Sequence, residues 1–428
     1  MQRIKKVFTI DAISGTKEKT LLWGNHHATV AWLDSNQNLN SNTEALLAVS
    51  TIQTLKTDFK DAFQQLKKFV EKRKDYVFGY LGYDLKNDVE NLTSNNLDET
   101  DFPDLFFFQP LKVIEVSKNQ IIFRYPENIQ NEIESDWLAI QKTTHAPTPK
   151  KTLTIKDRVS KETYINQVEK VLKYIQEGKV YELNYCMEFY AKNAIINPID
   201  SYLELNHISK APFATFLKFE DCYLLSASPE RFLKKIGTAL TSEPIKGTAK
   251  RDVNIDKDQQ LIANLKNNTK EIAENIMIVD LVRNDLSHIA KKGTVNVDEL
   301  CKIYSFKQVH QMISSISCKI KPNIHPVDAL KACYPMGSMT GAPKIASMNF
   351  IEELEHTKRG LYSGAVGYFT PEQNFDFNVV IRSILYNKAK NYVSFSVGSA
   401  ITAKANPEKE YEECLLKAKA MREVLTQH

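Results

Sequence analysis

Three β-rich runs near the carboxyl end decide the fold: SGAVGYFT (residues 363–370), FNVVIRSILY (377–386) and YVSFSVGSAI (392–401). Each run is rich in β-branched and aromatic residues, and short turns separate the runs, as in consecutive strands. Similar runs occur earlier, at residues 180–190, 213–219 and 222–228. Because helical patterns lie among these runs, the sequence predicts an α+β protein with antiparallel sheets.

Two helices have readable ends. Ser160 can cap a helix whose apolar residues recur at helical spacing, and Gly178 is well placed to end it. A later helix opens with Asn406 as its cap and Pro407 in its first turn. We expect both helices to pack one face against the sheets.

A connecting segment divides the chain. Residues 143–160 are rich in Thr, Lys and Pro and show no periodic apolar pattern, which is typical of a link between lobes. We therefore place a boundary near residue 150, with an N-terminal lobe at 1–150 and a second domain at 151–428. In the first lobe, GYLGYD (residues 79–84) predicts a strand leading into a tight turn.

Composition excludes several classes of protein. The 428 residues are 43% hydrophobic and 25% charged, as in ordinary globular chains, and 56 basic against 52 acidic residues give a net charge of +4. This balance does not favour nucleic-acid binding, and no stretch resembles a signal peptide or a membrane span. The six cysteines are scattered without a C-x-x-C pair, so we expect reduced thiols and a cytoplasmic location.

Four glutamates are candidates for binding a metal. Glu271 and Glu274 lie three residues apart on one predicted helix, and Glu410 and Glu413 lie three apart on another, with Lys417 on the same face. Four carboxylates without His or Cys form an all-oxygen set that suits Mg²⁺. Two solvated helix faces would show the same spacing, so periodicity alone does not decide between these interpretations.

Other candidates for chemistry lie in turns. In PIKGT (residues 244–248), Lys246 stands between a proline turn and a glycine, where burial would lower its pKa and free a nucleophile. An exposed, inert lysine is the alternative. Glu230, in SASPERF after an apolar run, is either a buried acid or half of a salt bridge at a strand end. GSMTGAPK (residues 337–344) has the composition of an anion-binding loop or of a surface turn, and it lacks the Walker pattern.

The order of the longer motifs resembles one enzyme family. The motifs are SASPERF, EPIKGT, KEIAENIMIVDLVRNDL, YPMGSMTGAPK, RGLYSGAVGYF, DFNVVIRS and NPEKEYEECLLKA. In this order they resemble the chorismate-binding enzymes over about residues 160–425, and the N-terminal FGYLGYDL resembles the component I proteins of that family. The resemblance implies an α/β sandwich, like that of anthranilate synthase component I, with two large antiparallel sheets flanked by helices.

The resemblance also implies a set of site residues. Mg²⁺ would be held by Glu274 and Glu413, with Glu271 and Glu410 supporting it through water. Glu230 would be the general acid that protonates the leaving C4 hydroxyl of chorismate. The residues implied to bind the substrate are Tyr368 and Arg382 at the enolpyruvyl carboxylate, Lys417 and the Gly398 backbone at the ring carboxylate, and Thr248.

Lys246 distinguishes members of the family. Enzymes resembling aminodeoxychorismate synthase component I have this lysine, whereas anthranilate synthases have alanine at the position. The resemblance implies that Lys246 attacks ring C2, and that ammonia then adds at C4 and expels the lysine. The product would be 4-amino-4-deoxychorismate, a precursor of para-aminobenzoate and folate. The sequence lacks a GxCxGxQ nucleophile motif, so a separate glutaminase subunit is the implied source of ammonia.

Four positions depart from the family pattern. Glu182 stands where amino-transferring members have Gln and water-adding members have Lys, which argues against isochorismate synthesis. Glu243, Gln311 and Ala400 replace Arg or Asn, His, and Gly respectively. The alternatives are anthranilate synthase component I, against which the absence of an LLES-type motif also counts, and a protein that binds chorismate without turnover.

Overall fold

The fold is described from a computed structural model for residues 2–36, 43–149, 151–306 and 309–426. The predicted boundary at residue 150 lies outside the described residues and stays a prediction. Strands from the two sides of this boundary pair directly, because β2 (Val30–Asp34) bonds β9 (Phe213–Phe219) and β4 (Val77–Leu81) bonds β17 (Ala365–Phe369).

The strands of the described chain form two branches of one antiparallel network of 20 strands. The first branch runs from β1 (Arg3–Thr9) through β6 (Gln120–Pro126), β5 (Leu105–Ser117), β3 (Ala45–Thr57), β2, β9, β10 (Cys222–Ser228), β19 (Ser383–Asn387) and β20 (Tyr392–Thr402) to β8 (Glu182–Ala191), which also pairs with the short β7 (Lys156–Asp157) and β16 (Gly341–Ala342). The second branch runs from β5 through β4, β17, β18 (Phe375–Val379), β11 (Arg231–Ile236) and β12 (Ala239–Glu243) to β15 (Val309–Lys319), which also pairs with β13 (Ile245–Lys250) and β14 (Asn296–Ser305).

The branches diverge at β5. Residues 105–108 of β5 pair with β3 on one edge and with β4 on the other, whereas residues 113–117 pair with β3 and β6. The two predicted antiparallel sheets are therefore present and are continuous through this shared strand. The predicted α+β sandwich fold is confirmed.

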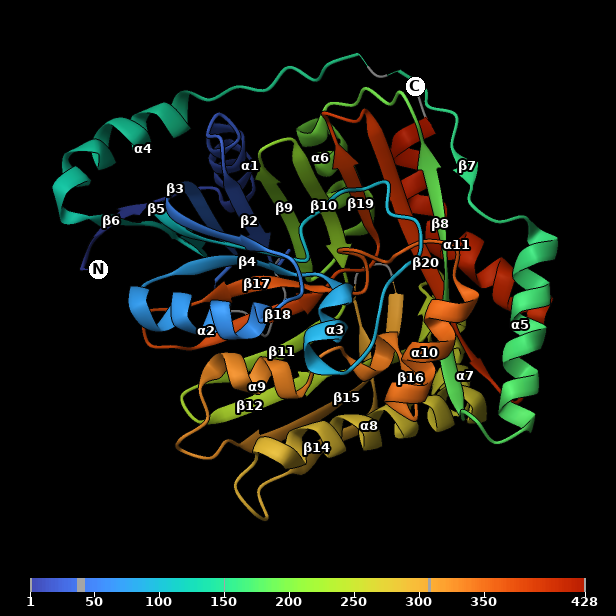
Figure 1. Ribbon diagram of the computed structural model, residues 1–428. Coiled ribbons are helices and arrows are strands. Elements are labelled where there is room, and N and C mark those ends of the chain that lie inside the picture. Colours follow the sequence, from blue (N-terminus) through green and yellow to red (C-terminus); the bar gives the residue numbers. More distant parts are fainter. Residues whose placement is uncertain (1, 37–42, 150, 307–308, 427–428) are drawn as a thin grey trace.

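Helices cover the outer faces of both sheets (Figure 1). The helices packed with the first sheet are α1 (Ile13–Gly24), α4 (Ile133–Lys142), α5 (Lys161–Gln176), α6 (Pro198–Ser209) and α11 (Pro407–Thr426). The second sheet packs against α2 (Ala62–Arg73), α7 (Ile255–Lys266), α8 (Thr269–Ile289) and α9 (Pro326–Ala332), while α10 (Lys344–Leu354) lies over β8 and β16. The short α3 (Lys86–Val89) and the 3₁₀ turns η1 (Tyr83–Leu85), η2 (Glu127–Glu132) and η3 (Gly337–Met339) complete the described elements.

An aromatic cluster joins strands of both sheets. Phe106 stacks on Phe219 with ring centroids 4.1 Å apart, and Phe78, Tyr80 and Phe108 pack in the same buried cluster. Full burial of each such side chain stabilises the fold by about 1.5–3 kcal/mol. This cluster fixes the two sheets relative to one another, and with them the ends of β8 and β13.

The predicted helix ends are confirmed. Ser160 Oγ accepts a hydrogen bond from Thr163 N at 3.1 Å, and Gly178 adopts a positive φ of +73° just beyond α5. Asn406 caps α11 by accepting from Lys409 N at 3.1 Å. Local capping chemistry was therefore sufficient to place these ends.

One predicted strand is wrong. The run 377–386 was expected to be continuous, but it divides into β18 and β19 with Arg382 between them at a φ of +52°. The apolar run continues through the break because Val379, Val380 and Ile384 are all buried, so the composition carries no signal of the break. The interruption places Arg382 outside the ladder that β19 forms with β10.

Within the described ranges, no helix is long and apolar enough to cross a membrane. All six cysteines are free thiols, in agreement with the sequence-based expectation.

Candidate active site

Lys246 and Glu182 meet where the two sheets approach each other. Lys246 belongs to β13 of the second sheet, and Glu182 begins β8 of the first. Lys246 Nζ donates to Glu182 Oε1 at 2.8 Å, and the two side chains are only 12% and 1% exposed. The lysine is thus a buried, paired amine and not an exposed turn residue.

The charges around Lys246 reverse the sequence-based argument about its pKa. Burial alone would lower the pKa of Lys246, but the negative charges of Glu182, Glu274 and Glu230 outweigh burial and raise that pKa above its ordinary value. The expectation that burial alone frees the amine is wrong for the unliganded site. The lysine is held charged, and it must lose a proton before it can act as a nucleophile.

Glu230 is buried at the end of β10. Its Oε1 accepts a hydrogen bond from Ser338 Oγ at 2.8 Å. Burial raises the pKa of Glu230 to about 7, although the Ser338 hydrogen bond and the charge of Lys246 lower it. Glu230 also lines a cavity of about 20 Å³, enough for a single water molecule. A carboxyl group in this setting is partly protonated near neutral pH and can donate a proton.

The loop 337–344 is folded against Glu230 and is not a free surface turn. Ser338 supplies the hydrogen bond to Glu230, while Lys344 Nζ bonds Asp285 Oδ2 of α8 at 2.5 Å. The lysine of this loop is therefore already paired within the chain. The loop acts on the site by holding the Glu230 side chain.

A buried ion pair anchors this loop to β8. Arg359 and Glu355 are 3% and 4% exposed and make two contacts, Nη2 to Oε1 at 2.7 Å and Nε to Oε2 at 2.9 Å. Arg359 also donates to the Met339 carbonyl at 2.6 Å and to the Asn184 carbonyl at 2.7 Å. One guanidinium thus joins the loop that carries Ser338 to the strand that begins at Glu182.

Replacing Arg359 with Met should destabilise the protein by roughly 3–5 kcal/mol, because it leaves the Glu355 carboxylate buried and uncompensated. Urea unfolding followed by circular dichroism measures this change. The matched control is Arg422→Met, since Arg422 is 38% exposed and pairs with an exposed Asp157; its loss should cost about 1 kcal/mol or less. Equal effects of the two substitutions would contradict this prediction.

The four predicted metal ligands come from α8 and α11. Glu274 Oε1 is buried and has no hydrogen-bond partner in the described chain, and burial raises the pKa of Glu274 to about 7. Burial likewise raises the pKa of Glu271, and the negative charge of Glu413 raises it further. Carboxylates of the two helices therefore act on one another, which agrees with a place for a cation.

The Lys270 ammonium lies among these glutamates and pairs with two of them. Lys270 Nζ lies 3.0 Å from Glu410 Oε1 and 3.7 Å from Glu274 Oε1, and Ser399 bonds the second oxygen of Glu410. No group of three or more His, Cys, Asp or Glu side chains in the described ranges is arranged as a complete metal site. Glu410 is thus fully engaged within the protein, whereas Glu274 Oε1 accepts no hydrogen bond and has only the longer contact with Lys270.

Lys417 lies beside Gly398 as well as Glu413. Its Nζ donates to the Gly398 carbonyl at 2.8 Å and pairs with Glu413 Oε1 at 2.6 Å. A Cβ at position 398 would come within 2.5 Å of Cys186 Sγ, so only glycine allows β20 to approach β8 this closely. The structure thus brings these three predicted residues together.

Arg382 is a half-buried cation for which no described side chain forms an ion pair. Burial lowers the pKa of Arg382, while the negative charge of Glu413 raises it. An anionic ligand would compensate this guanidinium, because carboxylates pair with arginine in a bidentate manner.

Tyr368 lies elsewhere in the fold. Its ring stacks on Phe78 at 5.4 Å, and it pairs with Asp376 across β18. The tyrosine that lies near Arg382 is Tyr362, which the sequence motifs did not single out. Both tyrosines belong to RGLYSGAVGYF, so the motif alone does not distinguish them. The backbone places the two side chains in different parts of the fold, because Tyr362 precedes β17 and Tyr368 lies within it.

The remaining predicted positions are near the site or support it. Thr248 is exposed and pairs with Gln311 across β13 and β15. Glu243 pairs with Arg231, the residue after Glu230, and Ala400 lies opposite Asn184 on β8. No contact of Thr248 with the other predicted residues is found in the described chain, so its substrate-binding role stays a prediction.

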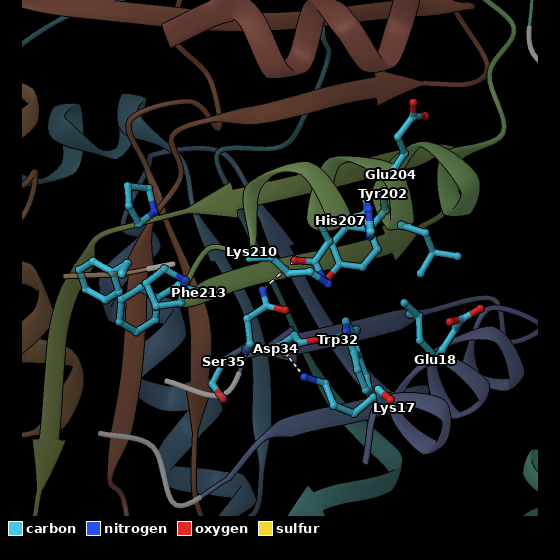
Figure 2. A pocket seen from close by; sticks show the side chains of 18 of the residues that line it. Lys17, Glu18, Trp32, Asp34, Ser35, Tyr202, Glu204, His207, Lys210 and Phe213 are labelled. Atoms are coloured by element: carbon cyan, nitrogen blue, oxygen red, sulfur yellow. Dashed lines mark hydrogen bonds and ion pairs between the residues drawn. The ribbon is translucent and has the colours of Figure 1, made fainter. Parts of the chain in front are cut away.

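A second, larger cavity of about 1030 Å³ lies between the N-terminal lobe and the rest of the chain. Figure 2 shows Trp32, Asp34 and Lys17 of the N-terminal lobe on one side and Tyr202 and His207 of α6 on the other. Arg231, Glu243 and Ile245 also line the cavity. It therefore ends against the strands that carry Lys246 and the residue after Glu230.

A proton-donating carboxyl near a largely buried amine, with the unpaired Arg382 and several carboxylates in the same region, fits an enzyme site for a small anionic substrate. A family model described as chorismate binding enzyme matches residues 10–423. The chain belongs to this family of chorismate-binding enzymes.

Named relatives include two kinds of synthase. A probable chloroplastic aminodeoxychorismate synthase of Oryza sativa subsp. japonica is 36% identical over 417 residues, or 86% of this chain and 46% of that protein. Aminodeoxychorismate synthase component 1 of Bacillus subtilis is 30% identical over 82% of this chain and 76% of that protein. A crystal structure of anthranilate synthase component I from Streptococcus pneumoniae TIGR4 matches with a TM-score of 0.78 and 25% identity, covering 90% of this chain and 93% of that one. The chain spans about half the length of the plant relatives.

Proposed function

We propose that this chain is an aminodeoxychorismate synthase component I, which converts chorismate and ammonia to 4-amino-4-deoxychorismate for para-aminobenzoate and folate synthesis. The observation that carries the proposal is the buried Lys246 amine, which is close enough to the buried acid Glu230 for each to act on the other's pKa. A nucleophile and a proton donor at one site are what substitution at a hydroxyl-bearing ring requires.

The proposed reaction has two halves. Lys246 attacks ring C2, the two ring double bonds shift, and the C4 hydroxyl leaves as water with a proton from Glu230. Ammonia then attacks C4, the double bonds shift back, and the C2–nitrogen bond to Lys246 breaks. The nucleophile is thereby regenerated, and the ring diene is restored in the product.

Cations of the chain would bind the two carboxylates of chorismate. Arg382 lacks an anionic partner within the described residues, and we propose that it binds the enolpyruvyl carboxylate beside Tyr362. Lys417, held at the Gly398 carbonyl, would face the ring carboxylate. Such charge-assisted bonds orient the ring between the amine and the acid.

Mg²⁺ is the proposed cofactor. The buried Glu274 oxygen, which accepts no hydrogen bond, and the Glu413 carboxylate of α11 fit a hard cation that takes oxygen ligands and keeps waters. Glu271 and Glu410 would support the ion through water. When bound, the ion would neutralise a carboxylate of the substrate.

Glu274→Gln should lower the affinity for Mg²⁺ by roughly 100-fold or more, since loss of a supporting partner alone costs about 10–100-fold. Isothermal titration calorimetry of the unliganded protein with MgCl₂ measures the affinity without relying on turnover. Glu408→Gln on α11, the helix that carries Glu413, is the control, because Glu408 is 56% exposed and pairs with Lys161. Unchanged Mg²⁺ binding in Glu274→Gln would exclude Glu274 as a ligand.

We propose that ammonia comes from a glutaminase subunit on a separate chain. The name component 1, which the Bacillus subtilis relative carries, supports a two-chain arrangement.

Mass spectrometry of the products tests the proposed function. The purified chain is incubated with chorismate, MgCl₂ and an ammonium salt at alkaline pH, where free ammonia is present. The expected product is 4-amino-4-deoxychorismate. Anthranilate would instead support an anthranilate synthase component I, and isochorismate would show addition of water. Unchanged chorismate, if it persists when a glutaminase partner is added, would indicate binding without turnover.

A further inference from the structure

Glu182 has a carboxylate that the proposed reaction does not yet use. One oxygen accepts the hydrogen bond of Lys246 at 2.8 Å, and the other, Oε2, is buried without a hydrogen-bond partner in the described chain. The side chain is 1% exposed, so water does not solvate it freely. A buried carboxylate is costly unless it is paired, and its single partner here is the amine that reacts.

No other carboxylate of the described site forms an ion pair with Lys246. Glu274 of α8 and Glu230 after β10 act on Lys246 through their charge, and Lys246 in turn acts on Glu271 and Glu413. None of these four lies within 4.0 Å of Nζ, the limit for an ion pair, whereas Glu182 does. Glu182 is therefore the group to which the proton of Lys246 can pass directly.

We propose that Glu182 is the general base of the reaction: it takes a proton from the Lys246 ammonium as the nitrogen attacks the ring, and it returns that proton when the lysine leaves. This inference rests on the proposed function. It goes beyond that function by assigning a catalytic role to Glu182, a residue that the proposed reaction does not otherwise use.

The proton balance closes over one cycle. In the first half, an N–H bond of the Lys246 ammonium breaks, its electron pair forms the bond to C2, and Glu182 becomes a carboxylic acid. Glu230 separately protonates the leaving hydroxyl. In the second half, ammonia adds at C4 and gives up one proton to the Glu230 carboxylate, the C2–nitrogen bond breaks, and the leaving amine recovers its proton from Glu182.

Burial makes this exchange possible without solvent. Because the Lys246–Glu182 pair is nearly closed to water, deprotonation by bulk hydroxide would be slow, and an internal base within hydrogen-bond distance replaces it. Glutamine at position 182 would preserve the shape and the hydrogen bond to the amine but could not accept a proton.

The test follows formation of the covalent intermediate without ammonia. Native chain, Glu182→Gln, Glu182→Asp and the control Glu188→Gln are each mixed rapidly with chorismate and MgCl₂. The intact mass is then recorded over time, and the modified residue is located by digestion. Glu188 is a matched control because it is a buried carboxylate on the same strand, paired with Arg158 at 2.9 Å.

The expected result is a Lys246 adduct, of mass equal to chorismate minus water, in the native chain and in Glu188→Gln at similar rates. In Glu182→Gln the adduct should form roughly 10²- to 10⁴-fold more slowly. Below about pH 7, where Glu230 stays protonated, its rate should rise about tenfold per pH unit because hydroxide must now remove the proton. Glu182→Asp, which keeps the base but shortens its reach, should lie between the two.

Three results would overturn the inference. A native rate in Glu182→Gln would exclude a base at this position. A slow rate that does not rise with pH below about 7 would show that Glu182 only shapes the site. If Glu182→Gln does not fold, as judged by circular dichroism, Glu182→Ala replaces it, and a native rate in that variant would exclude the role. An unmodified Lys246 in an active native chain would overturn the proposed lysine intermediate itself, which keeps the two failures distinct.

Discussion

Lys246→Ala should reduce formation of 4-amino-4-deoxychorismate by roughly 10³-fold or more, because loss of a covalent nucleophile removes the route through the intermediate. The amine is the reactive group of the proposed cycle, and the structure holds it in place by its 2.8 Å bond to Glu182. Mass spectrometry of product formed per minute, at saturating chorismate and MgCl₂, measures the loss.

Binding must be separated from chemistry in this variant. Chorismate affinity, measured by calorimetry, should change far less than the rate, since Arg382 and Lys417 are the proposed carboxylate partners. Lys234→Ala serves as a control for loss of a lysine from a strand of the same sheet; Lys234 lies on β11 and faces Thr241 and Asp376 in the ladders. Product with nitrogen at C4 at the native rate from Lys246→Ala would exclude a lysine intermediate.

The rate should fall as pH rises through about 7, because Glu230 must be protonated to donate to the leaving hydroxyl. Burial raises the pKa of Glu230 to about 7, so the acid form is complete below this value and is lost above it. The sign is that of a general acid: kcat is highest on the acidic side of the transition and declines on the alkaline side. The rate of adduct formation in the absence of ammonia measures this alkaline decline, because the equilibrium between ammonium and ammonia then plays no part.

Glu230→Gln should abolish the fall of the rate at alkaline pH and slow the reaction by roughly 10²- to 10⁴-fold. The pKa of Glu274 is also raised by burial to about 7, so the two groups must be distinguished. Raising the MgCl₂ concentration should shift a transition that belongs to a metal ligand, whereas the Glu230 transition should stay in place. A decline that survives in Glu230→Gln would belong to another group.

Local sequence patterns were enough for most of the fold. The runs at 180–190, 213–219 and 222–228 became β8, β9 and β10, because alternation and β-branched residues report burial between neighbouring strands. The caps at Ser160 and Asn406 were readable because each bonds a backbone group only three residues away. The run 377–386 failed, since its apolar residues continue through the break at Arg382.

The sequence by itself determined the family and its catalytic candidates, because the order of long motifs along a chain needs no folded geometry to be recognised. Only the tertiary structure decided that Tyr362, and not Tyr368, lies near Arg382. It also decided that Lys246 is held charged by a partner 64 residues away in sequence. The physical reason is that the pKa and the reach of a side chain depend on charges and burial supplied by distant strands. Those strands meet at this site because β5 belongs to both sheets.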